Sequence, residues 1–123
     1  MAEGLMEEIV RCRHWIEDAL EYSGGTHTFK DIVDGILNMS FQFWPAPRGC
    51  AITEICVFPQ KKVLHIFLAA GEKDQIVDMD ESAVRFAKEQ GCDAVTIAGR
   101  RGWKKVLAHK GYEEYFTTLA KDI

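Results

Sequence analysis

The chain has 123 residues, of which 47% are hydrophobic and 28% charged, and its formal net charge is −4. This length predicts a single domain over residues 1–123 that can bury a core of its own. The acidic balance argues against nucleic acid as a partner, because domains that bind it carry a basic excess. No apolar run reaches the roughly 18–20 residues of a membrane span, and the acidic N-terminus does not resemble a secretory signal.

Two helices are predicted at the N-terminus. Apolar residues recur at steps of three and four over residues 3–22, which predicts one amphipathic helix that ends at the Ser-Gly-Gly of residues 23–25. Thr28 is placed to cap a second helix, and Asp31 follows three residues later. The apolar stripe of residues 29–37 would then face the core.

The segment that follows is FQFWPAPRG. Pro45 and Pro47 are expected to interrupt any regular element there. Phe41 and Phe43 are expected in the core of the domain. Trp44 is a candidate for contact with another protein, and packing in the core is its alternative.

Four strands and two helices are predicted in the rest of the chain. In order, they are a strand at 51–58, a strand at 63–70, a helix at 73–90, a strand at 94–98, a helix at 102–110 and a strand at 115–119. A strand–helix–strand connection implies that the strands at 63–70 and 94–98 pair in parallel. The prediction is an α+β fold, a mixed sheet with flanking helices.

The four cysteines form no CxxC motif, and the histidines lack the spacing of zinc ligands. Cys50 and Cys56 would lie about 20 Å apart on one strand, which is too far for a disulfide. We therefore expect no metal site and no disulfide. Free thiols suit a reducing compartment and a protein that is not secreted.

Several short motifs, in this order of elements, resemble the GNAT fold of GCN5-related N-acetyltransferases. They are VLHIFLAAG, AVTIAG, and KGYEE with Gly111-Tyr112 after the last helix. AITEICVFPQKKVLHIFLAAG and GRRGW resemble still more closely small GNAT-like proteins of tailed bacteriophages. The resemblance implies one GNAT-like domain with two N-terminal helices and, if the protein is an enzyme, acetyl-CoA as its acyl donor.

The phosphate-binding motif of that family is missing. In active members a Q/R-x-x-G-x-G/A loop follows the fourth strand and holds the CoA pyrophosphate on its amides. Here the strand at 63–70 is followed by GEKDQIVDMDES, which has no glycine pair and carries five carboxylates that would repel phosphate. VFPQKK resembles the start of such a loop, but a strand follows it, so this register is rejected.

Glu54 and His65 are the candidate catalytic residues. Many family members place a general-acid tyrosine where this chain has Leu107. The resemblance implies an upstream carboxylate as base, for which Glu54 is the nearest candidate, and His65 could serve as a base too. The alternative is structural, with Glu54 on the polar face of a strand and His65 as a core residue with its hydrogen bonds satisfied.

A basic segment follows the strand at 94–98. Arg100 and Arg101 lie where ligands bind at the carboxyl ends of parallel strands, and they are candidates to hold a phosphate of CoA or nucleic acid. Gly99 and Gly102 beside them would let the backbone approach a ligand closely. Trp103 could stack on a ring or contact another protein. The alternative is a packed helix whose lysines point to water.

Three functional hypotheses follow. The first is a phage-type GNAT-fold protein with a degenerate acyl-CoA site and no cofactor, which binds other phage or virion proteins in the virion or the host cytoplasm. The alternative is an acetyl-CoA-dependent N-acyltransferase in which Arg100 and Arg101 replace the missing loop. The third is nucleic-acid binding through the basic segment, which the net charge disfavours.

Overall fold

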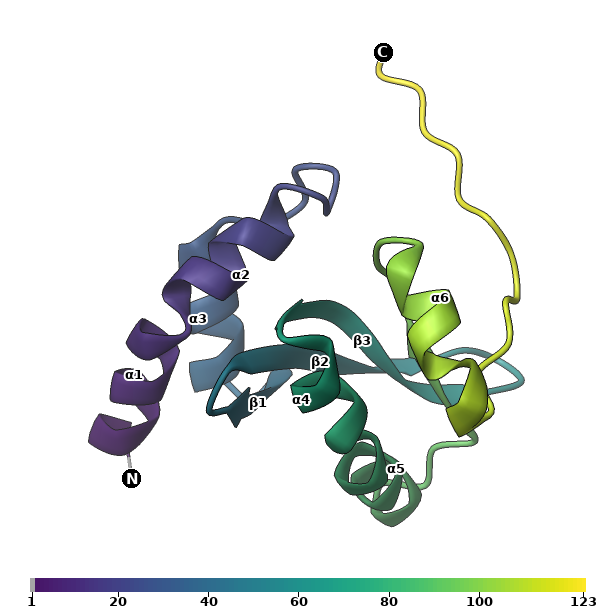
Figure 1. The fold of residues 1–123 in the computed structure, drawn as a ribbon, viewed down its shortest axis with the longest axis horizontal. Helices are drawn as coiled ribbons and strands as arrows, with labels where there is room; N and C mark the ends of the chain where they lie inside the picture. The colour runs from purple at the N-terminus through teal and green to yellow at the C-terminus, as the bar shows by residue number, and fades with distance from the viewer. Residues whose placement is uncertain (1) are drawn as a thin grey trace.

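A computed structural model describes residues 2–123 of the chain, with side chains from Gly4 onward (Figure 1). Within that range the chain forms one mixed sheet with helices on both faces, which confirms the predicted α+β class. The elements are α1 (Ala2–Arg11), α2 (Arg13–Leu20), α3 (Phe29–Leu37), β1 (Phe41–Ala46), β2 (Gly49–Val57), β3 (Lys62–Gly71), α4 (Lys73–Asp78), α5 (Asp80–Glu89), β4 (Ala94–Ile97), α6 (Gly102–Leu107) and the 3-10 helix η1 (Ala108–Lys110).

The helices cover opposite faces of the sheet (Figure 1). On one face α5 packs on Leu64, while α4 and α6 form a cluster around Ile76, Trp103 and Leu107. On the other face α1, α2 and α3 pack against β2 and β3 and form the largest cluster. Its buried members are Ile9, Cys12, Ile16, Ala19, Ile32, Ile36, Cys50, Ile52, Leu68 and Ala70, with Phe41 and Phe43 packed against them as predicted.

The sheet has the order β1-β2-β3-β4. The pairs β1–β2 and β2–β3 are antiparallel, and β3–β4 is parallel, as the strand–helix–strand connection predicts. Thr53 lies opposite Ile66 and Ile52 opposite Leu68, so Phe67 is an extra residue, a β-bulge in β3. Beyond this bulge the parallel pairing also stops.

The strands β3 and β4 diverge at this point. Their register runs from Val63 opposite Ala94 to Ile66 opposite Ile97, and β3 then continues alone on that side to Gly71. The final backbone bond between them joins the Ala98 amide to the Ile66 carbonyl at 3.0 Å. The divergence sets the position of the candidate site.

Both predicted long helices contain a bend. The helix predicted at 3–22 bends at Cys12, where the hydrogen-bond ladder still continues from the Cys12 amide to the Glu8 carbonyl and from the Ile16 amide to the Cys12 carbonyl. The helix predicted at 73–90 breaks at Met79, whose amide bonds to the Ile76 carbonyl three residues back. Periodicity does not register such bends, because the apolar stripe continues through them.

The predicted capping box of α3 is confirmed. The Asp31 amide donates to Thr28 Oγ1 at 3.2 Å, and the Thr28 amide donates to Asp31 Oδ2 at 2.8 Å.

Two predictions about other segments were wrong, one at Pro45 and one at residues 115–119. Pro45 does not end regular structure, because it lies in β1 opposite Cys50, and an edge strand tolerates a residue without an amide hydrogen.

The strand predicted at 115–119 is the other error. Residues 112–123 form no regular element, and the side chains of Tyr115, Phe116 and Leu119 are mostly exposed. Lys61 contacts Tyr115 and Lys104 pairs with Glu114, yet no described strand pairs with the segment. A β-forming sequence does not become a strand without a neighbouring strand to bond with.

Candidate functional site

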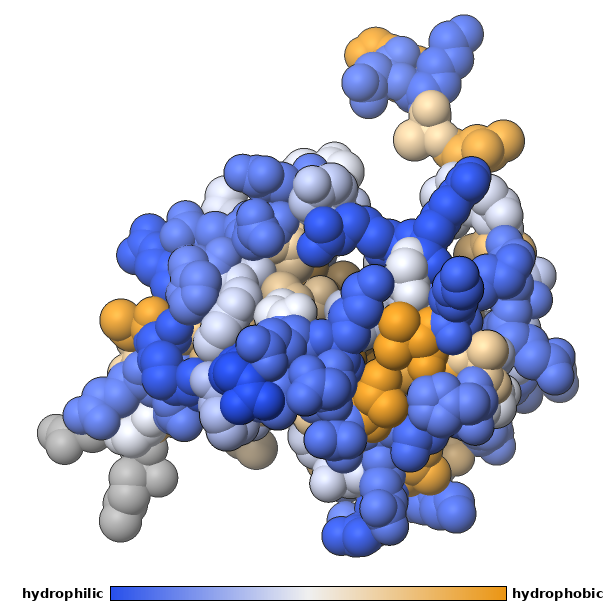
Figure 2. Space-filling view, in the orientation of Figure 1, coloured by the Kyte–Doolittle hydropathy of each residue, from blue (hydrophilic) through white to orange (hydrophobic). Residues whose placement is uncertain are grey.

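A cleft of about 370 Å³ opens where β3 and β4 diverge. Its walls are the α2–α3 loop on one side and the segment from Ala98 to Trp103 on the other, and β2 and β3 form its floor. Figure 2 shows this face hollowed between the end of α2 and α6. The titratable side chains that line it are Tyr22, His27, Glu54, His65 and Arg100, and Phe67 from the bulge lies among them.

Glu54 and His65, both predicted as catalytic candidates, lie side by side on the cleft floor. They are register partners on β2 and β3, and Thr96 is the partner of His65 on β4. The three side chains therefore form one row across the sheet. His65 Nδ1 lies 2.8 Å from Thr96 Oγ1, and Glu54 and His65 also line the cleft.

The environment of His65 favours its neutral form. Burial lowers the pKa of the imidazole below its usual value, and the nearby Glu54 carboxylate raises it by a smaller amount. At neutral pH the ring is therefore uncharged and one nitrogen carries a lone pair. Such a group can accept a proton.

An aromatic cluster lies beside this row. The ring centroids of Phe41 and Phe67 are 4.8 Å apart, and His27 lies 5.4 Å from Phe67 and 5.9 Å from Phe41. Phe41 is also the register partner of Glu54 on β1. This pairing places the aromatic cluster next to the row on the cleft floor.

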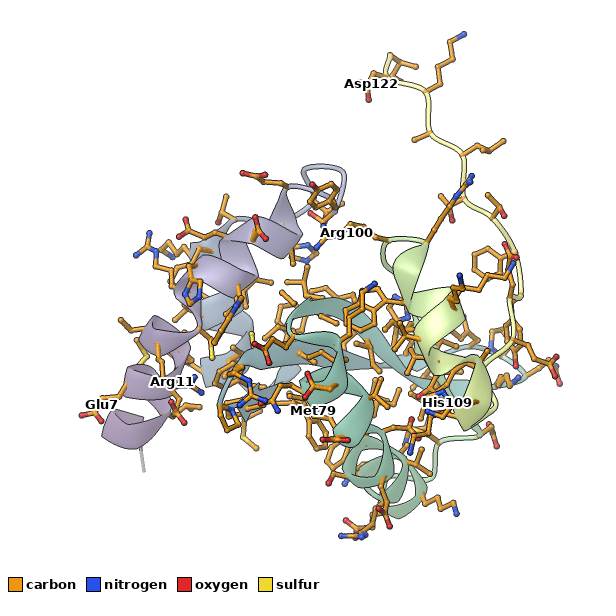
Figure 3. The ribbon with its side chains drawn as sticks, viewed as in Figure 1. Glu7, Arg11, Met79, Arg100, His109 and Asp122 are labelled. Carbon is orange, nitrogen blue, oxygen red and sulfur yellow. The ribbon has the colours of Figure 1, made fainter. Side chains whose placement is uncertain are left out.

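Arg100 links the two walls of the cleft. Its guanidinium carbon lies 4.3 Å from the centre of the Tyr22 ring, a cation–π contact between the β4–α6 segment and the α2–α3 loop. Figure 3 shows the labelled Arg100 between the end of α2 and α6. The neighbouring Arg101 is exposed and does not line the cleft.

The two glycines beside these arginines have partners within the chain. A Cβ on Gly99 would lie 2.9 Å from Trp103 Cδ1, and a Cβ on Gly102 would lie 2.9 Å from Lys73 Nζ. The sequence predicts that these glycines let the backbone approach a ligand. In the structure the space beside them is instead occupied by the side chains of Trp103 and Lys73. Lys73 joins Arg101 as a cation near the start of α6.

The carboxylates after β3 are partly neutralised. Arg48 pairs with Glu72 and lies 3.5 Å from Asp74, while Asp80 accepts a 2.7 Å hydrogen bond from the Tyr112 hydroxyl. Burial and this bond to Asp80 raise the pKa of Tyr112, so it stays protonated at neutral pH. Sequence reasoning counted the negative charges and missed Arg48, which is distant in the chain.

Both tryptophans predicted as contact residues pack against the chain itself. Trp44 Nε1 donates to Thr53 Oγ1 at 3.0 Å, and its ring meets Phe86 edge-on. Trp103 is 7% exposed and shares a cluster with Ile76. Among the described residues, the four cysteines are free thiols, no three metal-ligating side chains gather, and no helix is long and apolar enough to cross a membrane.

Sequence reasoning missed two residues that line the cleft and the one that bonds to His65 beneath it. Tyr22 and His27 lie in a glycine-containing loop, where no pattern marks them. Thr96 is a polar residue within the apolar strand β4, and that contrast was the one available signal.

Comparison with known proteins gives a match in structure alone. No protein-family model matches the sequence, and no curated protein matches it significantly. A solved structure described as a probable acetyltransferase superposes with a TM-score of 0.70 at 11% identity, covering 95% of this chain and 93% of that one. The chain has the fold of the GNAT-type acetyltransferases.

Two further solved structures resemble the chain, and the first of them is also described as an acetyltransferase. A predicted acetyltransferase from Clostridium acetobutylicum, solved with acetyl-CoA, matches with a TM-score of 0.61 and 13% identity over 76% of this chain and 71% of that one. A Thermus thermophilus protein, TTHA1254, matches with a TM-score of 0.53 and 16% identity, over 63% of this chain and 62% of its own length. None of these names refers to a bacteriophage, so the predicted phage or virion role has no support.

Proposed function

We propose that this GNAT-fold chain is an acetyl-CoA-dependent N-acyltransferase. The observation that carries the proposal is the row at the cleft floor, where a neutral imidazole and a carboxylate lie together beside the divergence of two parallel strands. The fold is shared with acetyltransferases, and one structural neighbour was solved with acetyl-CoA. The sequence hypothesis of an enzyme with a divergent cofactor loop is therefore favoured over a non-enzymatic binding module.

The residues at the divergence fit the acyl donor. After Ile66, the edge of β3 next to β4 forms no ladder bonds with another strand in residues 2–123. The peptide groups on this edge can therefore hydrogen-bond to the amides of the pantetheine arm. Lys73 and Arg101 place positive charge near the start of α6, where they would attract the phosphates. When bound, acetyl-CoA supplies a thioester carbonyl for attack by an amine.

His65 and Glu54 divide the proton chemistry. His65 Nε2 takes the proton from the acceptor amine, since burial lowers the pKa of the imidazole and favours its neutral form. Glu54, directly across the strand pair, stabilises the imidazolium that results. The same imidazolium can return the proton to the departing sulfur, because Leu107 at the usual tyrosine position has none to give.

Calorimetric titration of the full chain with acetyl-CoA tests the proposal. We expect a dissociation constant at or below about 100 μM, roughly 5.5 kcal/mol of binding free energy. Mass spectrometry of a panel of primary amines incubated with acetyl-CoA should then detect an acetylated product. No heat at millimolar acetyl-CoA would overturn the proposal.

A matched pair of variants tests the roles of the residues. His65→Gln should leave acetyl-CoA affinity unchanged and reduce turnover by about 100-fold or more, the range expected for loss of a general base. His109→Gln, at an exposed position in η1, is the control and should keep full turnover. Equal turnover in both variants would exclude His65 as the base.

A further inference from the structure

Thr96 is the one residue of β4 with a polar side chain. Its neighbours in the strand are Ala94, Val95 and Ile97, and all four residues are half-buried. Strand formation does not require the hydroxyl, because valine has nearly the same shape and an equal preference for strands. The hydroxyl therefore needs another explanation, and its one hydrogen-bond partner in the described chain is His65.

The contact fixes one nitrogen of the ring. His65 Nδ1 and Thr96 Oγ1 are 2.8 Å apart, and the two residues are held opposite each other by the parallel β3–β4 register. No hydrogen bond from His65 Nε2 to a residue in 2–123 accompanies it. The ring is thus anchored at Nδ1, and Nε2 is the nitrogen left for a ligand in the cleft.

The two neutral forms of the ring differ in what they can do. If Nδ1 carries the hydrogen, it donates to Thr96 Oγ1, and Nε2 has the lone pair that a base needs. If Nδ1 is the acceptor of the threonine hydroxyl hydrogen, Nε2 carries a hydrogen and cannot accept a proton. The charged and titratable groups that share the cleft with His65 are Glu54 from β2, His27 and Tyr22 from the α2–α3 loop, and Arg100.

We propose that Thr96 is a positioning residue for His65, holding the ring by an Nδ1–H···Oγ1 hydrogen bond so that Nε2 presents its lone pair to the cleft. This inference rests on the proposed function for its catalytic consequence. The hydrogen bond itself is a property of the folded chain and is tested without substrate. Thr96 touches no reacting atom and acts through His65.

Nitrogen NMR of the full ¹⁵N-labelled chain between pH 4.5 and 8.5 is the primary test. The His65 ring signals are assigned by their absence in His65→Gln. In the wild type the neutral ring should be protonated at Nδ1. In Thr96→Val both neutral forms should appear, and the pKa of His65 should fall, because the imidazolium loses a charge-assisted hydrogen bond.

Thr96→Ser keeps the hydroxyl and should keep the wild-type tautomer and titration. A wild-type ring protonated at Nε2 would overturn the proposal, and so would an unchanged or raised pKa of His65 in Thr96→Val. The amide spectrum of each variant reports whether the sheet is intact. If Thr96→Val unfolds, the serine variant and the wild-type tautomer still decide the question.

Steady-state kinetics with the amine identified above give the second test. Thr96→Val should lower kcat by about 10- to 100-fold, part of the roughly 100- to 10,000-fold that a general base contributes, with KM for acetyl-CoA unchanged. The acidic limb of its pH profile should move with the NMR pKa. If no amine is acetylated, the proposed function fails while the NMR result stands. A kcat unchanged in Thr96→Val alongside a changed tautomer would refute the catalytic consequence.

Discussion

The two sides of this molecule differ in how their buried side chains are grouped. On the side of α1, α2 and α3, ten buried residues form one cluster against strands of nine and ten residues. On the side of β4 and α6 there are two clusters of three buried residues each, and the four-residue strand β4 packs against both. The chain after Tyr112 has no regular structure. The cleft lies where the two sides meet. The large cluster can thus hold the floor residues Glu54 and His65 in place, while the opposite wall rests on the smaller cluster of Ile76, Trp103 and Leu107.

Core packing should show this contrast in stability most strongly. Ile52 on β2 is fully buried in the large cluster, so Ile52→Ala should lower the free energy of unfolding by about 2–5 kcal/mol. Leu119→Ala, in the 90% exposed tail position, is the control and should change it by less than about 0.5 kcal/mol. Urea titration of both variants measures the difference. Similar losses in the two would mean that Leu119 is buried in solution.

The end of β3 gives a second test, of backbone rather than side-chain packing. Gly71 has φ +107, and a Cβ there would lie 2.3 Å from Gly49 Cα and 2.4 Å from the Arg48 carbonyl oxygen. Strain and overlap together predict a loss of about 2–4 kcal/mol for Gly71→Ala. Gly91 has φ +74, but nothing lies within 4 Å of a Cβ added there. Gly91→Ala should therefore lower the free energy of unfolding by only about 1–2 kcal/mol. Thermal unfolding should rank the two in that order.

The capping box of α3 is a smaller contribution on the well-packed side. Thr28→Ala removes the acceptor of the Asp31 amide and should cost about 1 kcal/mol. Thr117 makes a 3.3 Å side-chain bond to Glu114 in the tail, and Thr117→Ala should have almost no effect. Chemical unfolding resolves the two. A tail variant as costly as the cap variant would mean that the tail is packed in solution.

The smallest effect appears only as the pH falls. Burial lowers the pKa of His65 in the folded chain, so below about pH 6.5 the unfolded chain binds the proton more readily. The stability that the folded chain gains from keeping His65 neutral is complete above about pH 6.5, and it is lost as the pH drops through the folded pKa. His65→Gln should therefore show a flatter fall of unfolding free energy between about pH 7 and 5 than the wild type. An identical slope would mean that His65 titrates alike in both states.

Much of the fold could be predicted from local pattern. The Thr28–Asp31 capping box and the strands β2 and β3 follow from residue types a few positions apart, and the parallel pairing of β3 with β4 follows from the helical connection between them. The errors came where a distant partner decides. Pro45 sits in a strand because β1 is at the edge of the sheet, and residues 115–119 have no neighbouring strand to pair with.

The candidate site divides in the same way. Residue types alone marked three of the side chains that could do chemistry, because Glu54, His65 and Arg100 stand out against apolar or glycine-rich surroundings. That they share a cleft, and that Thr96 joins them, depends on the folded chain, since the row is made by the register of three strands. The bulge at Phe67 and the divergence of β3 from β4 are set by packing between segments far apart in the chain, which no local pattern encodes.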